Sequence, residues 1–507
     1  MGFLVQARIR GRALRFQGIR FNSTTSNYRL TCGLEIHAQL NTGLKLFSNS
    51  QTSFHARPNS KVSYYDAALP GTQPKFNFYA LLLALRAAVA LDCTVRDSFS
   101  FDRKHYFYGD QPAGYQITQH YHPYAYGGKL ELFRRDGVEV DCLPVRIKQI
   151  QIEQDTGKST YIDDVAHIDL NRTNQGLIEL VTEPDIHTPE AAGVFVKKLQ
   201  ILLRHLGVCT GELETGAMRV DVNVNVNDGQ RCEIKNLSST SAIVGAIKAE
   251  FDRQKRIVQK GGHVEMETRG WDGTKTWKLR GKEEGVDYRY MPDPELQPIK
   301  VSSSTVEQVK SGLPELPDSI FEALLKSPYN VPLKDARTLM ETELVNYYKQ
   351  VYNYLEQHGS PKPQAASNWI VHRLYGELNN QDLQVIESNL PPVNVMGDII
   401  LLVQDGQKLT SSSAILLLRH IVSNPITEPI DKVIESLDLT KADQLDDIDE
   451  LCAQIIDENP KVSDQVRSGR KPKSIMFLVG QVMRACQGRV DPNLVKSRIE
   501  KALGIMN

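Results

Sequence analysis

Three segments of the sequence alternate polar and apolar residues with the period of a β-strand, and each gathers ionisable side chains on one face. In LTCGLEIHAQL every second residue is apolar, so Glu35 and His37 project side by side from the other face. In MRVDVNVNV the valines alternate with Asp221 and other polar residues. In IKQIQIEQD, Glu153 lies on the polar face and Gln154 on the apolar one. A solvated sheet surface is the alternative interpretation of each strand alone.

Carboxylates together with one imidazole are ligands suited to a hard divalent cation such as Mg²⁺, which nucleotide phosphates normally share. Zinc favours cysteine or several histidines. The seven cysteines are scattered and never have the C-x-x-C spacing. We therefore expect free thiols and no zinc.

The segment FDRKHYFYGDQPAGYQITQ combines Arg103 and Lys104 with Tyr106 and Gln116 among turn-forming residues. Cationic donors and aromatic rings at this density suit a phosphate and a base. A tyrosine-rich hairpin is the competing interpretation. DTGKST ends like a phosphate-binding loop, but the first glycine of that motif would have to stand at Ile152. Any use of ATP is therefore expected to proceed without a Walker loop.

Residues 28–300 are rich in strand patterns, with two punctuated helices at Phe78 to Leu91 and from Thr188, as N-cap, to Gly207. From Val301 the pattern is helical, with boundaries at LPELP, SPYNVP, GSPKP and NLPPVN. The sequence predicts an α+β body followed by an all-α portion. The run TRGWDGTKTWKLRGKEEGVDYRYMPDPE carries many charges of both signs, which indicates a salt-bridged surface or a charged cleft, and of the two we expect the surface.

Charge is distributed unevenly in a chain whose net charge is only −1. Residues 1–26 contain five arginines and no acid, which is typical of a mitochondrial transit peptide, with a basic nucleic-acid arm as the alternative. Residues 431–458 hold ten acids and two bases, and residues 461–501 hold ten bases and three acids. No stretch approaches 18 consecutive apolar residues, so we expect no membrane span.

The chain resembles the B subunits of the tRNA-dependent amidotransferases, the Glu-tRNA(Gln) and Asp-tRNA(Asn) enzymes. The matching stretches, in order along residues 30–490, are GLEIHAQL, ALPGTQP, FDRKHYFYGDQPAGYQITQ, IEQDTGKS, HIDLNRTNQGLIELVTEPD, ETGAMRVDVNV, EIKNLSS, ETRGWD, DYRYMPDPEL, SNWI and FLVGQVM. The resemblance implies a cradle-like kinase domain built on antiparallel sheet at 27–300, an all-α connector at 301–430 and a small helical tail that touches tRNA at 431–507.

The resemblance also implies functional residues. The expected Mg²⁺ and ATP ligands are Glu35, His37, Glu153, Glu179 and Asp221. All of them except Glu179 are also the expected catalytic residues. Nucleotide, phosphate or acceptor-end contacts are expected from Asp102, Arg103, Lys104, Tyr106, Gln116, Lys235, Arg280 and Arg289. Many relatives have a second Glu where this chain has Gln154. We assign the ligand role to Glu153, because Gln154 falls on the apolar face of the predicted strand.

The implied activity is ATP-dependent phosphorylation of the glutamyl γ-carboxylate on Glu-tRNA(Gln), followed by amidation to Gln-tRNA(Gln) in the mitochondrial matrix. No glutaminase signature is present, so the resemblance implies that the amidase subunit of the amidotransferase supplies ammonia, and that a small third subunit wraps the two. Expected tRNA contacts in the tail are Arg467, Arg470, Lys471, Lys473, Arg484 and Arg489. The alternatives are a non-catalytic tRNA-binding scaffold and a free-standing ATP-dependent ligase.

Overall fold

The computed structural model describes residues 28–281, 287–424, 426, 428–441, 448–486 and 488–505. The chain divides into two compact units, Met1–Gln200 with Gly207–Ser311 and Ile201–Leu206 with Gly312–Asn507. The predicted transit peptide, residues 1–26, lies outside the described residues, as do residues 282–286 of the charged run.

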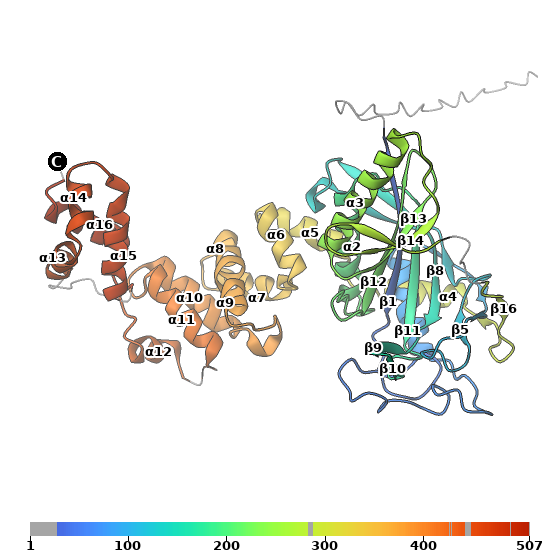
Figure 1. The fold of residues 1–507 in the computed structure, drawn as a ribbon. Helices are drawn as coiled ribbons and strands as arrows, with labels where there is room; N and C mark the ends of the chain where they lie inside the picture. Colours follow the sequence, from blue (N-terminus) through green and yellow to red (C-terminus); the bar gives the residue numbers. More distant parts are fainter. Residues whose placement is uncertain are drawn as a thin grey trace, which may run out of the picture. The chain divides into compact units, whose positions relative to one another are not determined.

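A ten-stranded sheet forms the centre of the first unit, with β1 in its interior (Figure 1). The strand order is β15-β14-β13-β12-β1-β11-β8-β6-β2, and β7 also pairs with β8. The strands are β1 (Leu30–Gln39), β2 (Thr94–Val95), β6 (Ala125–Tyr126), β7 (Lys129–Phe133), β8 (Cys142–Gln154), β11 (Gly176–Thr182), β12 (Met218–Val226), β13 (Cys232–Leu237), β14 (Glu267–Trp271) and β15 (Thr276–Gly281).

The predicted α+β class is confirmed, but the large sheet is mixed rather than wholly antiparallel. Only the β13–β14 pair is parallel among the described strand pairs of this sheet. A parallel pair needs a long crossover connection, and helix α3 (Thr240–Gln259) supplies it. The alternation predicted from the sequence is confirmed along β12, where every second residue is buried, and in β1 Leu34 and Ile36 are buried beside half-buried Glu35 and His37.

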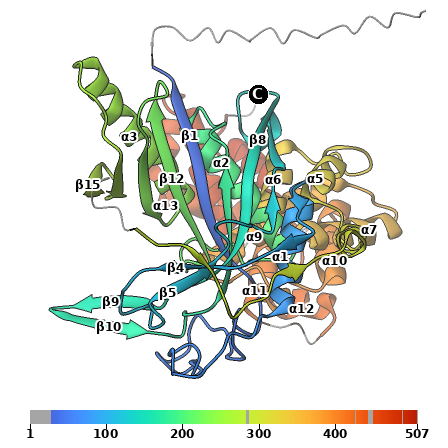
Figure 2. The same ribbon diagram turned by 90° about the vertical axis from the view of Figure 1, so that its right-hand side faces the viewer.

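Three smaller sheets complete the strands of the first unit. The FDRKHYFYGDQPAGYQITQ segment does form a hairpin, β4 (Asp102–His105) with β5 (Tyr115–Thr118), to which β16 (Met291–Pro292) adds a third strand. Figure 2 shows β4 and β5 crossing in front of the large sheet. The two other pairs are β9 (Lys158–Ile162) with β10 (Val165–Asp169) and β3 (Ser98–Phe99) with β17 (Ile299–Lys300).

Both predicted helices of the first unit are confirmed, as α1 (Phe78–Ala90) and α2 (Pro189–His205). Thr188 caps α2, since its hydroxyl oxygen accepts a hydrogen bond from the Ala191 amide at 3.3 Å. The expectation of only two helices here was wrong. The part predicted to be strand-rich also contains a short turn, η1 (Arg134–Asp136), and the 20-residue α3, whereas α4 (Ser303–Ser311) lies in the part predicted to be helical.

Helix α3 was not predicted because the stripe of side chains that it buries changes character along its length. Ile243, Ala246 and Ile247 supply the first part of this stripe, whereas Glu250 and Gln254 supply the rest. Apolar periodicity therefore ends halfway along the helix, although the buried face continues.

The second unit is helical, and the helices that begin at Pro317, Leu333, Pro363 and Val393 start at the four predicted proline-rich boundaries. It consists of α5 (Pro317–Leu325), α6 (Leu333–Glu341), α7 (Val345–Gln357), α8 (Pro363–Trp369), η3 (Ile370–Leu374), α9 (Tyr375–Asn380), η4 (Glu387–Asn389), α10 (Val393–Asp405), α11 (Ser411–Ser423), α12 (Ile430–Ser436), α13 (Ile448–Glu458), α14 (Pro460–Arg467), η5 (Pro472–Ser474), α15 (Ile475–Ala485) and α16 (Pro492–Ala502). Two separate hydrophobic cores hold these helices, one formed by buried residues between Phe321 and Leu439 and one by buried residues between Ile448 and Leu503.

Among the described residues, no helix has both the length and the apolar character needed to cross a membrane. All seven cysteines are free thiols.

Candidate functional site

Five adjacent strands of the large sheet, β13, β12, β1, β11 and β8, bring acidic side chains together. The registers place Glu35 opposite Asp221, across the β1–β12 pair, and His37 opposite Glu179, across the β1–β11 pair. Side chains on directly opposed residues lie close enough to interact. The strand faces predicted from the sequence therefore meet in one place.

Two overlapping groups of side chains have the composition of a divalent cation site. One consists of Glu35, His37 and Glu179, and the other of Glu35, Asp221 and Glu233. Within each group the potential ligand atoms all lie within 4.8 Å of one another. Glu35 belongs to both groups, so it stands at the centre of the cluster.

Glu233 was not among the residues expected from the sequence. It lies on β13, between buried Cys232 and buried Ile234, so it projects from the same face as Lys235. The alternation in CEIKNL was a usable signal, but the strand is only six residues long.

Glu153 lies beside these groups but is not a member of either. Both of its carboxylate oxygens accept hydrogen bonds, one from the Gln116 amide at 2.6 Å and one from the Thr118 hydroxyl at 2.7 Å. The His37 Nε2 atom is 3.9 Å from Glu153 Oε1. Gln154 faces elsewhere, since its Oε1 accepts from the Ile117 amide and its side chain lines a different cavity.

Lys235 is the nearest cation to the second group. Its Nζ lies 2.8 Å from Asp221 and 2.9 Å from Glu233. The β12–β13 register shifts between Val220 and Val222, and Asn236 has a φ of 63°. This bulge turns Lys235 toward Asp221, as bulges beside functional sites commonly re-aim a side chain.

The β4–β5 hairpin contributes Lys104, which lies opposite Gln116 in the hairpin ladder. The ammonium group stands 4.9 Å from the centre of the Tyr288 ring. Burial alone lowers the pKa of Lys104, but the nearby Glu153, Tyr290, Glu179 and Tyr288 together outweigh burial, so the pKa is raised. Lys104 is therefore a positive charge facing the carboxylate cluster.

The carboxylates raise one another's proton affinity. Burial, then Asp221 and Glu233, raise the pKa of Glu35 against the opposing effect of Lys235. Burial, Glu153 and Glu35 raise the pKa of Glu179 well above its usual value. A divalent cation relieves this kind of crowding, and the oxygen-rich donor set fits Mg²⁺ or Mn²⁺.

His37 is suited to a ligand role by its protonation state. Burial and the charges of Arg219, Lys104 and Lys235 lower its pKa well below the usual value. The ring is therefore neutral near pH 7, so its 3.7 Å approach to Glu179 is a polar contact and not an ion pair. A neutral imidazole nitrogen is the form that binds a metal.

An open cavity of about 410 Å³ adjoins the cluster, within the range of roughly 300–1,000 Å³ found for small-molecule sites. Its lining includes His37, Gln116, Glu153, Asp155, Thr156, Arg219, Asp221, Lys235, Asn236 and Ser238. Arg219 and Asp155 are paired at 3.0 Å across this wall. The cavity joins acidic ligands to cationic and hydroxyl donors, which is the combination that a metal-bound nucleotide requires.

Tyr106 also belongs to the neighbourhood of the cluster. Its ring contacts Tyr108 and Tyr288 with centroid distances of 5.7 and 6.2 Å. Burial and the nearby Glu153 raise the pKa of its phenol, so it stays neutral.

Three of the remaining predicted residues, Asp102, Arg103 and Arg289, make their contacts outside the cluster. Asp102 is buried and accepts a hydrogen bond from the Tyr121 amide at 2.9 Å. Arg103 pairs with Asp293 at 2.7 Å and with Glu295 at 3.0 Å. Arg289 is exposed and lies 3.7 Å from Asp287. Arg280 lies on β15, and its side chain is outside the described part of the chain.

The expectation that the charged run from Thr268 to Glu295 forms only a surface was wrong for two of its residues. Arg269 is 7% exposed and Asp293 is 6% exposed. Both are paired, because a buried charge is costly without a partner. Arg269 contacts Glu250 and Glu267, and Asp293 pairs with Arg103.

The raised pKa values of Glu35 and Glu179 predict a pH-dependent cation affinity. Their folded-state pKa values lie above the unfolded ones, so the ion-free protein loses stability as the pH rises through that interval. A bound cation removes this loss. We expect Mn²⁺ to raise the thermal unfolding midpoint more at about pH 8 than at about pH 5. An equal shift at both pH values, or an equal shift in an Asp221→Ala variant, contradicts the assignment.

Comparison with known proteins agrees with the resemblance found in the sequence motifs. A family profile described as the GatB/GatE catalytic domain matches residues 30–307, and one described as the GatB domain matches residues 350–503. Together the two profiles account for most of the chain.

Curated relatives align over nearly the whole length. The proteins named as the mitochondrial B subunits of glutamyl-tRNA(Gln) amidotransferase from Scheffersomyces stipitis and Yarrowia lipolytica are each 46% identical, covering 94% and 95% of this chain and 96% and 95% of their own. The protein of the same name from Debaryomyces hansenii is 44% identical over 94% of this chain and 95% of its own. The mitochondrial location predicted from the N-terminal segment is confirmed by these relatives. The chain therefore belongs to the family of glutamyl-tRNA(Gln) amidotransferase B subunits.

Proposed function

We propose that this chain uses ATP and Mg²⁺ to phosphorylate the γ-carboxylate of glutamate on Glu-tRNA(Gln), so that ammonia converts it to Gln-tRNA(Gln) in the mitochondrial matrix. The observation that carries the proposal is the cluster of Glu35, Glu179, Asp221 and Glu233, which Lys104 and Lys235 face and which meets an open cavity at Asp221. The relatives' shared name supplies the substrate class.

The chemistry explains why a nucleotide is needed. A carboxylate is a poor acyl donor, because substitution at its carbon would have to expel an oxide ion. In the proposed reaction a γ-carboxylate oxygen attacks the γ-phosphorus of ATP, the bond to the bridging oxygen breaks and ADP leaves. Ammonia then attacks the carbonyl carbon of the acyl phosphate, the carbon–oxygen bond breaks, and phosphate leaves with a proton from the nitrogen. No protein nucleophile is required.

The residues of the cluster divide the work by their chemistry. Glu35, His37, Glu179, Asp221 and Glu233 would hold Mg²⁺, which supplies positive charge to the transferring phosphoryl group when bound. Lys104 contributes a fixed positive charge on the hairpin side. Lys235 holds Asp221 and Glu233 in place by its two contacts. Gln116 and Thr118 orient Glu153, which faces His37.

Ammonia is expected from a partner. Most free ammonia is protonated near neutral pH, and the sequence carries no glutaminase signature. We propose that the amidase subunit of the amidotransferase delivers ammonia to this site and that a small third subunit wraps the two chains. The proposed kinase domain spans 27–300, with the β4–β5–β16 sheet closing the cradle over the large sheet, followed by the connector at 301–430 and the tail at 431–507.

The tail is proposed to contact tRNA phosphates through basic side chains. Arg467, Arg470, Lys471, Lys473 and Arg484 are exposed. Arg489 is half-buried and pairs with Asp438, which makes it the weakest of the six candidates. The alternative of a solvated helical face still applies to each residue.

A double variant, Arg470→Ser with Lys471→Ser, tests this contact. Each phosphate that loses its cation should reduce the slope of log affinity against log salt by about 0.7 to 0.9. We expect the variant complex to bind Glu-tRNA(Gln) with a slope shallower by roughly 1.4 to 1.8, at unchanged activity under saturating tRNA. Lys326→Ser, an exposed lysine of the same unit, is the control. An unchanged slope argues for the solvated face.

The function is tested by supplying the assembled complex with γ-labelled ATP and Glu-tRNA(Gln), without glutamine or ammonia. We expect label to pass to an acid-labile acyl phosphate only when the charged tRNA is present, and Gln-tRNA(Gln) to form when ammonia is added. Amidation without consumption of ATP would exclude the kinase. Glutamine-dependent amidation by the chain alone would instead favour the free-standing ligase.

A further inference from the structure

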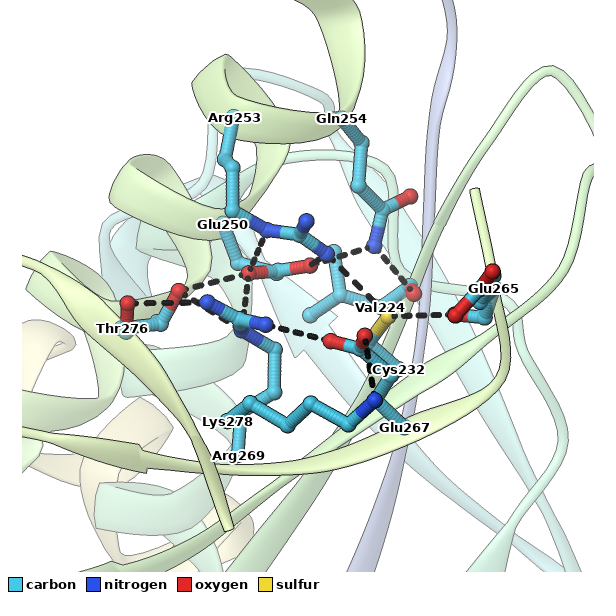
Figure 3. Close-up of polar contacts among 10 residues, drawn as sticks. All are labelled: Val224, Cys232, Glu250, Arg253, Gln254, Glu265, Glu267, Arg269, Thr276 and Lys278. Atoms are coloured by element: carbon cyan, nitrogen blue, oxygen red, sulfur yellow. Dashed lines mark hydrogen bonds and ion pairs between the residues drawn. The ribbon is translucent and has the colours of Figure 1, made fainter. Parts of the chain in front are cut away.

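A buried network of charged side chains ties helix α3 to the edge of the large sheet (Figure 3). At its centre is Glu250, whose exposed fraction is 0%. Its carboxylate accepts hydrogen bonds from Arg253 at 2.7 and 2.9 Å, from Gln254 at 2.8 Å and from Thr276 at 2.7 Å. The Arg269 Nε atom lies 3.3 Å from the same carboxylate.

The network reaches four consecutive strands. Gln254 also donates to the Val224 carbonyl of β12 at 3.0 Å, and Arg253 donates to the Cys232 sulfur of β13 at 3.4 Å. Arg269 belongs to β14 and Thr276 to β15. The Glu250 carboxylate therefore contacts β14 and β15 itself, and the two helix residues that are hydrogen-bonded to it, Gln254 and Arg253, contact β12 and β13.

This network and the proposed cation site occupy opposite faces of the same strands. On β13, Cys232 contacts the network, whereas Glu233 and Lys235 project to the site. On β14, Arg269 contacts Glu250, whereas the hydroxyl of Thr268 donates to Glu233 at 3.1 Å. Because side chains alternate along a strand, a slip of one residue would remove both sets of contacts.

Backbone pairing alone defines the register of this part of the sheet only weakly. The parallel β13–β14 pair has only three registered partners, Cys232 with Glu267, Glu233 with Thr268 and Ile234 with Arg269. The register shifts on both sides of this pair, in β12–β13 and in β14–β15. Short strands between two bulges are weakly specified by backbone pairing.

Buried ion networks are a poor source of stability, because apolar side chains of similar volume often stabilise a core as well or better. Fixing one arrangement among several is the better-attested role of such groups. We propose that Glu250, through Arg269 and Arg253, is a positioning residue that fixes the register of β13 and β14, and thereby places Glu233 and Lys235 in the divalent cation site. The inference rests on the proposed function for the identity of that site.

The test is the affinity of the assembled complex for Mn²⁺ alone, measured by electron paramagnetic resonance without nucleotide or tRNA. Glu250→Gln keeps the shape of the side chain but removes its charge. We expect it to weaken Mn²⁺ binding about 10- to 100-fold, as loss of a residue that orients metal ligands does. Asp252→Asn, an exposed change on the same helix, should leave the affinity unchanged. Glu250→Asp should recover part of the loss.

The outcomes separate this inference from the proposed function. If the wild-type complex binds no Mn²⁺, the cation site itself is refuted. If the wild type binds Mn²⁺ and Glu250→Gln binds it equally well, only the positioning role is refuted. Should Glu250→Gln fail to assemble, Arg269→Lys takes its place, since it keeps the charge but loses the forked contacts to Glu250 and Thr276. We then expect Arg269→Lys to weaken Mn²⁺ binding by about 10-fold or more, and unchanged Mn²⁺ binding would refute the positioning role.

Discussion

Replacing Asp221 with alanine is expected to reduce tRNA-dependent phosphate release from ATP by roughly 10³-fold or more. Asp221 lies opposite Glu35 and belongs to one of the two ligand groups. The alanine variant lacks this anionic ligand. It also lacks one of the two carboxylates that contact Lys235, so that of these two contacts only the one to Glu233 remains. Both changes weaken the placement of positive charge at the transferring phosphoryl group.

The matched control for this variant is Asn225→Ala, on the same polar face of β12 but four residues farther along. Asn225→Ala should release phosphate at the wild-type rate and should assemble into the complex in the wild-type amount. Normal phosphate release from Asp221→Ala, with normal tRNA binding, would leave a scaffold that positions tRNA for a partner. Loss of complex formation in the variant would show instead that Asp221 is needed for assembly.

Replacing Lys104 with methionine should lower the same rate by about 10² to 10³-fold, the loss measured when one donor to a developing charge is removed. Methionine keeps most of the length and apolar stem of lysine, so packing against Tyr288 is preserved. The ammonium group is the charge that the hairpin places beside Glu153 and Glu179. The carboxylate crowding at Glu179 should also increase without it, because Lys104 is one of the charges that oppose the rise in the Glu179 pKa.

Lys129→Met is the control, because Lys129 is exposed and pairs only with the neighbouring Glu131 among the contacts described for it. Its rate should equal the wild-type rate. The rate of Lys104→Arg should lie between the rates of Lys104→Met and the wild type, since arginine keeps the positive charge but changes its position. A Lys104→Met rate within a factor of about three of the wild type would remove Lys104 from the phosphoryl site.

The sequence predicted the faces of the site strands but not all of their neighbours. Alternation placed Glu35 and His37 on one face of β1 and Asp221 on one face of β12, and both faces are as predicted. Periodicity carries no information on which strands pair or in which register. The opposition of Glu35 to Asp221 and of His37 to Glu179 follows from the β1–β12 and β1–β11 ladders, which only the fold supplies.

The parts that escaped prediction share a physical cause. Glu250 and Arg269 are buried charges that satisfy each other, so they look like surface residues in a sequence. Helix α3 was missed for that reason, and Arg269 was assigned to the surface. Lys235 was among the expected contact residues, but its pairing with Asp221 depends on the β12–β13 bulge beside Asn236, which the sequence does not reveal. Tertiary pairing decided each of these cases.

The proposed function requires carboxylates from separate strands to hold one divalent ion beside a nucleotide. Crystals of the complex soaked with Mn²⁺ and a non-hydrolysable ATP analogue, measured at the manganese absorption edge, would locate both. We predict an anomalous peak in contact with Glu35 and with at least two of His37, Glu179, Asp221 and Glu233, and phosphate oxygens of the analogue in the adjoining cavity. A manganese peak and nucleotide bound elsewhere, with these side chains unchanged, would contradict the proposed site.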